Sequence, residues 1–407
     1  MSINGVLRSP ASIFFGSGQR AALAEIVTTF GQRALVCSDE RFLTDARLVE
    51  MAQSLRSAGI EMELYDRTLA ELPLECITEA SELARKFAPN VIVAVGGGSC
   101  IDLAKLVALS LAYPGDLSDF YGELKVPGPV LPVIAIPTTA GTGSEITPVA
   151  VLGDPQRKLK VGISSPHLIP RIALCDPELT LSCPAGLTAV AGADALTHAI
   201  EAFTAITRPY QPGLALRQVF IGKNSLSDQH ARTAIASLAG YLSQSVRSGD
   251  DLNAREQVMY GSMTAGLAFG VAGTAAAHAL QYPVGALTKT AHGLGVAALM
   301  PYVMEYNRPA VLAEFVEIAR QFGRTEGDNE MLASMAIDAV AALFADIGIP
   351  ADLRSLGVEQ KDLAWISEQS LLSARLVNNN PRQLDLGAMR QIAEAAFHGD
   401  RSRLRNS

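Results

Sequence analysis

The first 180 residues alternate between short runs of strand-forming residues and longer amphipathic runs, and this alternation limits the possible fold strongly. Runs of the buried-strand type occupy residues 33–38, 90–95 and 130–137. Apolar residues recur at helical spacing in residues 44–59 and 77–87. Parallel strands need a long crossover connection, which is usually a helix. The pattern therefore predicts an α/β fold with a Rossmann-like parallel sheet that helices cover on both faces.

The pattern changes near residue 183. Beyond it the chain is rich in Ala, Leu and Glu, and strand-like runs nearly vanish. We therefore expect two domains, an α/β domain over residues 1–182 and an all-α domain over residues 183–407. The least regular part of the second half is residues 207–228, which contain two prolines and two glycines. We expect a long loop there, and long loops in compact domains are often functional.

Composition and charge exclude several classes of protein. Apolar residues make up 49% of the chain and charged residues 18%, which permits a large core. The net charge of −8 and the lack of a long basic run argue against nucleic acid or an anionic membrane as partner. Five scattered cysteines, no C-x-x-C pair, no secretory-type N-terminus and no long apolar run favour a cytoplasmic protein.

A glycine triplet links a strand-like run to a helix-like run in the segment VIVAVGGGSCIDLAK. Gly96, Gly97 and Gly98 allow a ligand to approach the backbone closely. The helix is expected to begin at Ser99, with Asp102 at the spacing of a capping box. Free N–H groups at a helix N-terminus suit a pyrophosphate. The sequence lacks G-x-G-x-x-G, so the standard dinucleotide fingerprint is not met.

Polar side chains also follow two other strand-like runs. The loop TTAGTGSE carries the hydroxyls of Thr138, Thr139, Thr142 and Ser144, and open α/β sheets bind ligands at such strand ends. A solvated turn is the alternative. Asp39 follows the run at 33–38 and could accept both ribose hydroxyls of NAD while repelling the 2′-phosphate of NADP. It could equally be a plain helix N-cap.

A carboxylate and three imidazoles lie in otherwise apolar segments. Asp194 and His198 are four residues apart and share one face of a predicted helix. Burying that pair is costly unless a local hydrogen bond or a shared metal satisfies it. His278 in GTAAAHAL and His292 before a glycine would complete a set suited to Fe(II), Zn(II) or a similar ion. The other histidines are not accompanied by potential metal ligands in a comparable pattern.

Five motifs occur in the same order in a known family: GGGSCIDLAK, PTTAGTGSE, DPELT, GADALTHAIEAF and HALQYPVGALTKTAHG. Over nearly its whole length the chain resembles the iron-containing (group III) alcohol dehydrogenases. The resemblance implies an NAD-binding α/β domain, a helical metal-binding domain, a small-molecule alcohol or aldehyde as substrate, and a homodimer or larger oligomer.

The resemblance also assigns roles to residues. The four metal ligands of the family correspond to Asp194, His198, His278 and His292. Its pyrophosphate loop corresponds to Gly96, Gly97, Gly98 and Ser99. Residues that line its nucleotide correspond to Thr138, Thr139 and Ser144. Its cofactor-selecting acid corresponds to Asp39, and a lysine near the nicotinamide ribose to Lys160.

Two features depart from the usual family pattern. Tyr282, followed by Pro283, stands where many members have a second histidine near the substrate. The irregular segment 207–228 is longer than in a typical member. Both features resemble the hydroxyacid-oxoacid transhydrogenase branch, and 4-hydroxybutyrate dehydrogenases share the form HALxYP. Tyr282 could relay the alcohol proton, bind the substrate, or simply fill the space of the histidine.

The sequence therefore predicts a metal-dependent NAD-linked alcohol dehydrogenase or aldehyde reductase, whose substrate could be a hydroxyacid such as 4-hydroxybutyrate. A hydroxyacid-oxoacid transhydrogenase with bound cofactor is an alternative. A lyase resembling dehydroquinate synthase is another, although that family uses a Glu/His/His metal set. A carboxylate-bearing substrate needs a cationic anchor, for which the irregular segment offers Arg208, Arg217 and Lys223, unless these lie on the surface.

Overall fold

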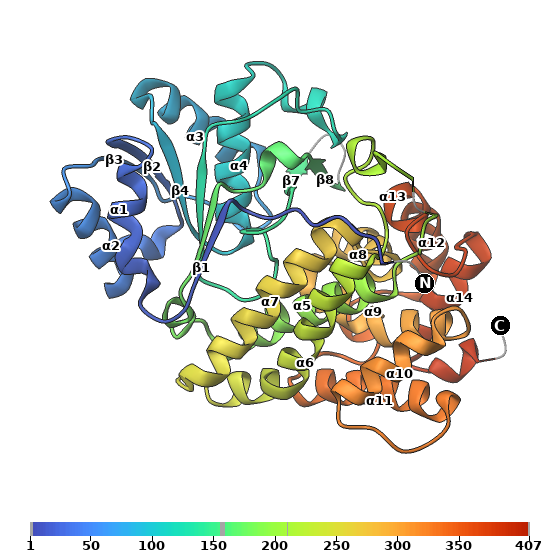
Figure 1. Cartoon of the computed structure of the whole chain (residues 1–407). Helices are drawn as coiled ribbons and strands as arrows, with labels where there is room; N and C mark the ends of the chain where they lie inside the picture. The colour runs from blue at the N-terminus through green and yellow to red at the C-terminus, as the bar shows by residue number, and fades with distance from the viewer. Residues whose placement is uncertain (1–2, 155–158, 210, 406–407) are drawn as a thin grey trace. The chain divides into compact units, whose positions relative to one another are not determined.

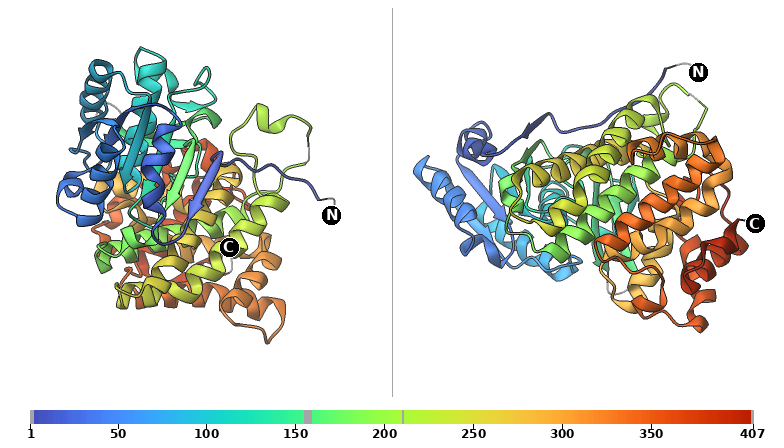
Figure 2. Two further views of the ribbon diagram at one scale, coloured as in Figure 1. Left: turned by 60° about the vertical axis from the view of Figure 1, so that its left-hand side comes forward. Right: turned by 90° about the horizontal axis from the view of Figure 1, so that it is seen from below.

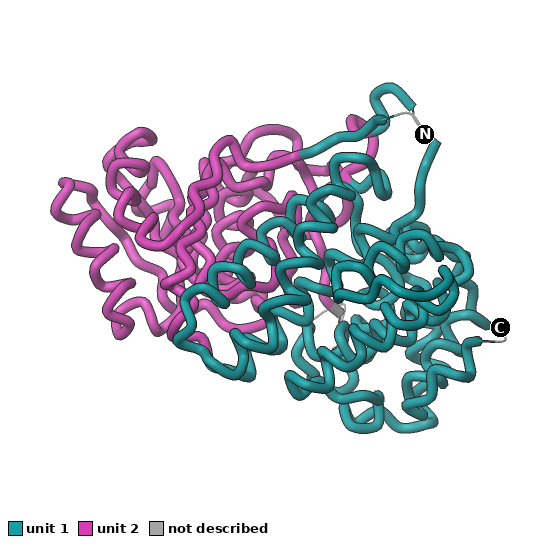
Figure 3. Tube along the Cα trace, turned by 60° about the horizontal axis from the view of Figure 1, so that its bottom comes forward, with its two compact units in different colours: residues 1–7, 184–214, 220–407 teal, residues 8–183, 215–219 magenta. Residues whose placement is uncertain are grey.

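The computed structural model describes residues 3–154, 159–209 and 211–405. The chain forms two compact units (Figure 3). The α/β unit comprises Arg8–Cys183 and Ala215–Val219. The helical unit comprises Met1–Leu7, Pro184–Leu214 and Phe220–Ser407. The chain therefore leaves the helical unit briefly, within the irregular segment, to add five residues to the α/β unit.

A six-stranded parallel sheet forms the centre of the α/β unit (Figure 1). Its strands, in spatial order, are β1 (Ser12–Phe15), β9 (Ile172–Cys175), β6 (Val133–Pro137), β4 (Val91–Gly96), β2 (Arg33–Cys37) and β3 (Glu61–Tyr65). The central strands β4 and β6 are buried along their whole length. This burial on both faces explains their continuous apolar sequences.

Helices cover both faces of this sheet, as the sequence predicts. They are α1 (Leu23–Thr28), α2 (Ala46–Ser57), α3 (Leu74–Phe87) and α4 (Gly98–Ala112). Side chains of successive strand residues enter different cores, because they point to opposite faces. Leu35 packs in the core that contains α3 and α4, whereas Val36 packs in the core that contains α1 and α2.

The strand order reverses between β2 and β4. From β2 the chain continues outward to β3 and then returns to β4 on the other side of β2. Ligands of open α/β sheets bind at the carboxyl ends of the strands beside such a reversal. Asp39 follows β2 and Gly96 ends β4, so both predicted nucleotide elements lie at this reversal.

A second, three-stranded sheet in the α/β unit is formed by β5 (Gly122–Glu123), β8 (Leu159–Ser164) and β7 (Val149–Asp154). Strands β7 and β8 are antiparallel, whereas β5 and β8 are parallel. The backbone N–H of Val151, in β7, donates to the Asp102 carboxylate on α4. The small sheet is thereby joined to the helix that follows β4.

The structure confirms that the second part of the chain is helical, since the described residues after Cys175 contain no strand. Its helices are α5 (Ala185–Thr204), α6 (Ser225–Arg247), α7 (Leu252–Ala272), α8 (Ala276–Thr288), α9 (His292–Asn307), α10 (Leu312–Gln321), α11 (Asn329–Asp346), α12 (Leu363–Leu371), α13 (Ala374–Val377) and α14 (Leu386–His398). Helices α5, α6 and α7 run side by side (Figure 2). In the described residues no single helix is long and apolar enough to cross a membrane, although α7 and α8 qualify as a pair bent by 101°.

The irregular segment ends earlier than the sequence suggested. Asn224 is the N-cap of α6, where its side chain accepts hydrogen bonds from the N–H groups of Leu226 and Ser227. The hydroxyl of Ser227 accepts from the N–H of Asn224 and closes a capping box. Residues 225–228, expected in the loop, are therefore the first turn of α6. Asn-x-x-Ser was the signal for this start.

The expected capping box of α4 is wrong. The helix begins at Gly98 with Gly97 as N-cap, and no side chain caps it. The Asp102 carboxylate instead accepts from the Ser144 hydroxyl at 2.5 Å and from the N–H of Val151 at 2.9 Å. The buried Lys105 ammonium donates to the same hydroxyl at 2.9 Å. This network holds Asp102 away from the helix start and ties α4 to the loop after β6.

We predict a pH-dependent loss of stability at Glu145, which is buried beside this network. Burial raises the pKa of Glu145 to about 7 from an ordinary value of 4.5. Between these values the folded state binds more protons than the unfolded state, so stability falls as the pH rises through this window. The substitution Glu145→Gln should remove this loss of stability, because the amide does not ionise. The variant should gain up to about 3 kcal/mol relative to wild type between about pH 5 and pH 8.

Urea unfolding at the two pH values measures this gain. The matched control is Glu82→Gln, because Glu82 is an exposed residue of α3. Its stability should follow the wild-type pH dependence. The same pH dependence in Glu145→Gln and wild type would contradict the prediction.

Candidate metal and nucleotide sites

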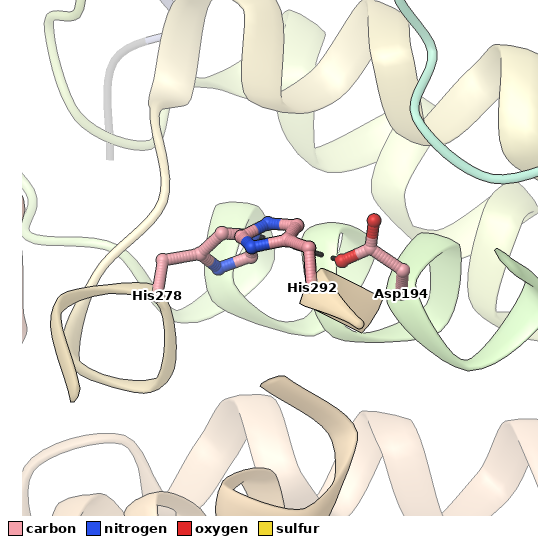
Figure 4. Close-up of side chains that lie close together, drawn as sticks. All are labelled: Asp194, His278 and His292. Carbon is pink, nitrogen blue, oxygen red and sulfur yellow. Dashed lines mark ion pairs between the residues drawn. The ribbon is translucent and has the colours of Figure 1, made fainter. Parts of the chain in front are cut away.

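Three of the four predicted metal ligands converge in the helical unit (Figure 4). Asp194 lies on α5, His278 on α8, and His292 is the first residue of α9. One ligand atom from each lies within 4.8 Å of the other two. The Nε2 atom of His278 is 3.7 Å from Oδ1 of Asp194. These three residues are called the metal group below.

His198 lies at the border of the metal group. Its Nε2 atom is 3.8 Å from Oδ1 of Asp194, as expected for residues one turn apart on α5. Its ring stacks on His278, with centroids 4.7 Å apart, and on Phe269 at 4.2 Å. The structure thus brings His198 beside the metal group. However, His198 is not among the residues whose ligand atoms all lie within 4.8 Å of one another.

Glu201 orients His278, and the sequence analysis missed it. Its buried carboxylate lies 2.6 Å from Nδ1 of His278 and also accepts from the backbone N–H groups of Ala275 and Ala277. Burial alone would raise the pKa of Glu201, but His278 and these N–H groups hold it below its ordinary value. An Nδ1–H bond to Glu201 leaves the Nε2 lone pair facing the metal group.

The donor set of the metal group fits a divalent ion. Nε2 of His278 is buried and makes no hydrogen bond to any described residue. A buried polar atom without a partner is costly. A cation at this point would satisfy it. Two imidazole nitrogens and one carboxylate oxygen suit Fe(II) and Zn(II), and His198 is near enough to add a fourth donor.

We predict that Glu201→Gln weakens metal binding by about 10- to 100-fold, as is typical for partners of metal-ligating histidines. The amide keeps the size of the side chain but removes the charge that fixes the His278 ring. Calorimetric titration of metal-free protein with Zn(II) measures the change. Glu305→Gln is the control, because Glu305 is also buried in this unit but pairs with Arg308 and Arg405. Equal affinities of Glu201→Gln and wild type would contradict the role.

Tyr282 lies one turn after His278 on α8, as the sequence predicted. Its ring stacks on that of His292, with centroids 6.1 Å apart and an interplanar angle of 24°. Burial raises the pKa of the Tyr282 phenol, the charge of Arg375 opposes that shift, and the carboxylates of Glu201 and Asp194 add to it. Tyr282 therefore lies against the metal group. Its part in a reaction stays a prediction.

The glycine triplet packs closely against its surroundings in the α/β unit. Gly96 has a φ of +151°, and a Cβ there would lie 2.5 Å from the Cys100 sulfur. A Cβ on Gly98 would lie 2.7 Å from a carbon of Thr142. Larger residues therefore cannot occupy these positions without displacing neighbours. The N–H groups at the start of α4 have no side-chain cap, which is what an anion site at a helix N-terminus requires.

The other predicted nucleotide residues have different surroundings. Ser99 is half-buried in the first turn of α4, Thr138 is buried and Thr139 is half-buried beside Gly97. The hydroxyl of Ser144 is already engaged by Asp102 and Lys105. The ammonium of Lys160, on β8, forms an ion pair with Glu71. Contacts of these side chains with a nucleotide stay predictions.

Asp39 forms a tight pair with Arg41. It is the N-cap of the 3-10 helix η2 (Glu40–Leu43), where Oδ1 accepts from the N–H of Arg41. The Arg41 guanidinium donates to Oδ1 at 2.8 Å and to Oδ2 at 2.7 Å. Burial alone would raise the pKa of Asp39, but Arg41 holds it below its ordinary value. The N-cap alternative is therefore observed, and it is compatible with a selective role toward NAD.

We predict that Asp39→Ala shifts the cofactor preference toward NADP. The substitution removes the carboxylate that would repel a 2′-phosphate and releases the Arg41 guanidinium to bind one. The ratio of the NADP and NAD dissociation constants should fall by about tenfold or more. Calorimetry with each nucleotide measures the ratio. The control Asp39→Ala/Arg41→Ala should lose the gain, and an unchanged ratio in Asp39→Ala would count against selection by Asp39.

Comparisons with known proteins cover both units. A family model described as "Iron-containing alcohol dehydrogenase" matches residues 10–177. A second model, "Fe-containing alcohol dehydrogenase family, C-terminal", matches residues 188–397. The 1,3-propanediol dehydrogenase of Citrobacter freundii is 35% identical over 386 residues, covering 94% of this chain and 95% of that protein.

Two further matches concern the fold and the branch of the family. A crystal structure of 1,3-propanediol oxidoreductase has a TM-score of 0.90 at 32% identity and covers 98% of this chain and 100% of that one. The mitochondrial hydroxyacid-oxoacid transhydrogenase of Caenorhabditis briggsae is 30% identical over 416 positions, which cover 95% of this chain and 89% of that protein. The likeness therefore extends over the whole fold.

Proposed function

Because the chain belongs to the iron-containing alcohol dehydrogenase family, we propose that it is a metal-dependent, NAD-linked dehydrogenase of small alcohols or hydroxyacids that also reduces the corresponding carbonyls. The convergence of Asp194, His278 and His292 carries this proposal. The family match also favours an oxidoreductase over the dehydroquinate synthase-like lyase. We further propose a cytoplasmic homodimer or larger oligomer, as the sequence led us to expect.

A divalent ion in the metal group would polarise the substrate oxygen, and NAD would accept the hydride from the carbon that bears it. The residues of this chain supply positions and charge. Glu201 fixes the ring of His278, and Asp194 supplies negative charge in a buried site. We propose that Tyr282, whose ring stacks on that of His292, accepts a hydrogen bond from the alcohol and passes its proton toward solvent.

The α/β unit supplies the proposed nucleotide site. The uncapped start of α4 would offer N–H groups to the pyrophosphate, and we propose that Asp39, which follows β2, accepts the ribose hydroxyls. The pair with Arg41 keeps Asp39 ionised, and an ionised carboxylate accepts two hydroxyls more strongly than a protonated one. Thr138, Thr139, Ser99 and Lys160 are proposed to line the nucleotide.

Reconstitution with metal tests the proposal. Metal-free protein loaded with Fe(II) or Zn(II) should oxidise 1,4-butanediol and reduce the cognate aldehyde, with NADH appearing or disappearing in step. His278→Ala should lose metal binding and at least about a hundredfold in turnover. His398→Ala, on α14, is the control and should retain both. Full turnover by metal-free protein or by His278→Ala would contradict metal dependence.

Tyr282 favours the transhydrogenase as second candidate, because it stands where simple alcohol dehydrogenases of the family often have a histidine. The 30% identical transhydrogenase is consistent with that branch. The same metal-loaded protein distinguishes the two activities. Exchange of reducing equivalents between a hydroxyacid and an oxoacid, without release of NADH, would identify a transhydrogenase. Accumulation of free NADH identifies a dehydrogenase.

A further inference from the structure

Arg375 is held on an aromatic face with its hydrogen-bond donors unused. It lies on α13 and is half-buried. Its guanidinium carbon is 4.3 Å from the ring centroid of Phe220, which is itself buried. Within the described residues, Arg375 makes no ion pair and no hydrogen bond. The cation–π contact therefore fixes the guanidinium in place and leaves its planar edge open.

Two other candidate cations of the helical unit have different surroundings. The Lys223 ammonium is 2.6 Å from Glu314 and 3.4 Å from Asp228. Arg208 donates one hydrogen bond to the carbonyl of Asn378 at 3.4 Å, and its buried Nε has no hydrogen-bond partner among the described residues. Both residues belong to the irregular segment that the sequence offered as a source of an anchor. The two carboxylates beside Lys223 weaken that expectation for Lys223, because an engaged cation must give up its partners to bind a substrate.

Arg375 lies on a helix that contacts the helix of a metal ligand. Helix α13 packs against α8, which carries both His278 and Tyr282. The Tyr282 ring in turn stacks on His292. Helix α8 therefore connects α13, which carries Arg375, to the metal group.

We propose that Arg375 binds the carboxylate of a substrate whose hydroxyl or carbonyl oxygen lies at the metal group. This inference rests on the proposed dehydrogenase function and names its substrate class. Arg375 lies on α13, whereas the residues of the metal group lie on α5, α8 and α9. The substrate is accordingly an acid whose carboxylate is separated from the reacting carbon by further carbons, rather than a 2-hydroxyacid. Phe220 positions the guanidinium, and the carboxylate completes its hydrogen bonds in bidentate geometry.

Paired substrates test the proposal on metal-loaded enzyme with NAD. The acid is 4-hydroxybutanoate, and 1,4-butanediol is its neutral match. Arg375→Gln should raise the KM of the acid by about 10- to 100-fold and leave that of the diol within about twofold. Arg375→Lys should recover part of the loss, because it keeps the charge but not the fork of donors. Equal changes for acid and diol, or none, would overturn the role of Arg375.

Arg354→Gln is the matched control, since this guanidinium also lies over a phenylalanine, Phe397, at 5.8 Å, and its side chain is more than half exposed. Arg354→Gln should behave as wild type toward both substrates. A selective loss of the acid in this variant as well would overturn the specific role of Arg375, because any nearby cation would then suffice.

A binding measurement separates this inference from the proposed function. Saturation-transfer NMR with butanoate, and with 1-butanol as neutral probe, needs no turnover. Butanoate should bind wild type and Arg354→Gln but not Arg375→Gln. If the enzyme oxidises the diol but Arg375→Gln binds butanoate as wild type does, the role of Arg375 is overturned. The proposed dehydrogenase activity would then still stand. A third outcome is a protein that turns over no substrate with any metal but still binds butanoate through Arg375. This outcome would support the anion site and contradict the proposed dehydrogenase activity.

Discussion

The contact between the Glu201 carboxylate and Nδ1 of His278 is the interaction on which the chemistry of the helical unit depends. A carboxylate with such low exposure is stable only when donors surround it, and here two backbone N–H groups and one imidazole do so. The same contact selects the ring nitrogen that faces Asp194. The hydrogen bonds of Glu201 therefore join α5 to the start of α8 and orient a metal ligand at once.

A comparable arrangement organises the α/β unit. Lys105, Asp102 and Ser144 satisfy one another in the core between α4 and the loop after β6. Because the network is internal, it leaves the start of α4 without a side-chain cap and holds the glycine triplet against that loop. The N–H groups proposed to bind pyrophosphate are thus kept available by a polar network that lies one helical turn away.

Charge around the metal group is distributed unevenly. Asp194 and Glu201 place negative charge among the histidines, whereas Arg375 places positive charge on the neighbouring helix α13. A neutral alcohol needs only the metal group with its negative charge. An acid also needs the positive charge of Arg375, because the carboxylate of the acid would otherwise be repelled by Asp194 and Glu201. This asymmetry is the physical reason to expect substrates with a distant carboxylate.

The sequence by itself determined the alternation of strands and helices around β2, β4 and β6, the polar residues at the ends of these strands, and the Asp194–His198 face of α5, because these depend on residues close together along the chain. It failed where side chains found distant partners. Glu201 and His278 are 77 residues apart, and Ser144 and Asp102 are 42 apart, so no periodicity reports either contact. From the sequence we expected the cations of the loop 207–228 to bind a substrate carboxylate. The packing of α13 on α8 led us to propose Arg375 instead. Only the tertiary structure decided which buried charges are satisfied within the chain and which are left to bind a ligand.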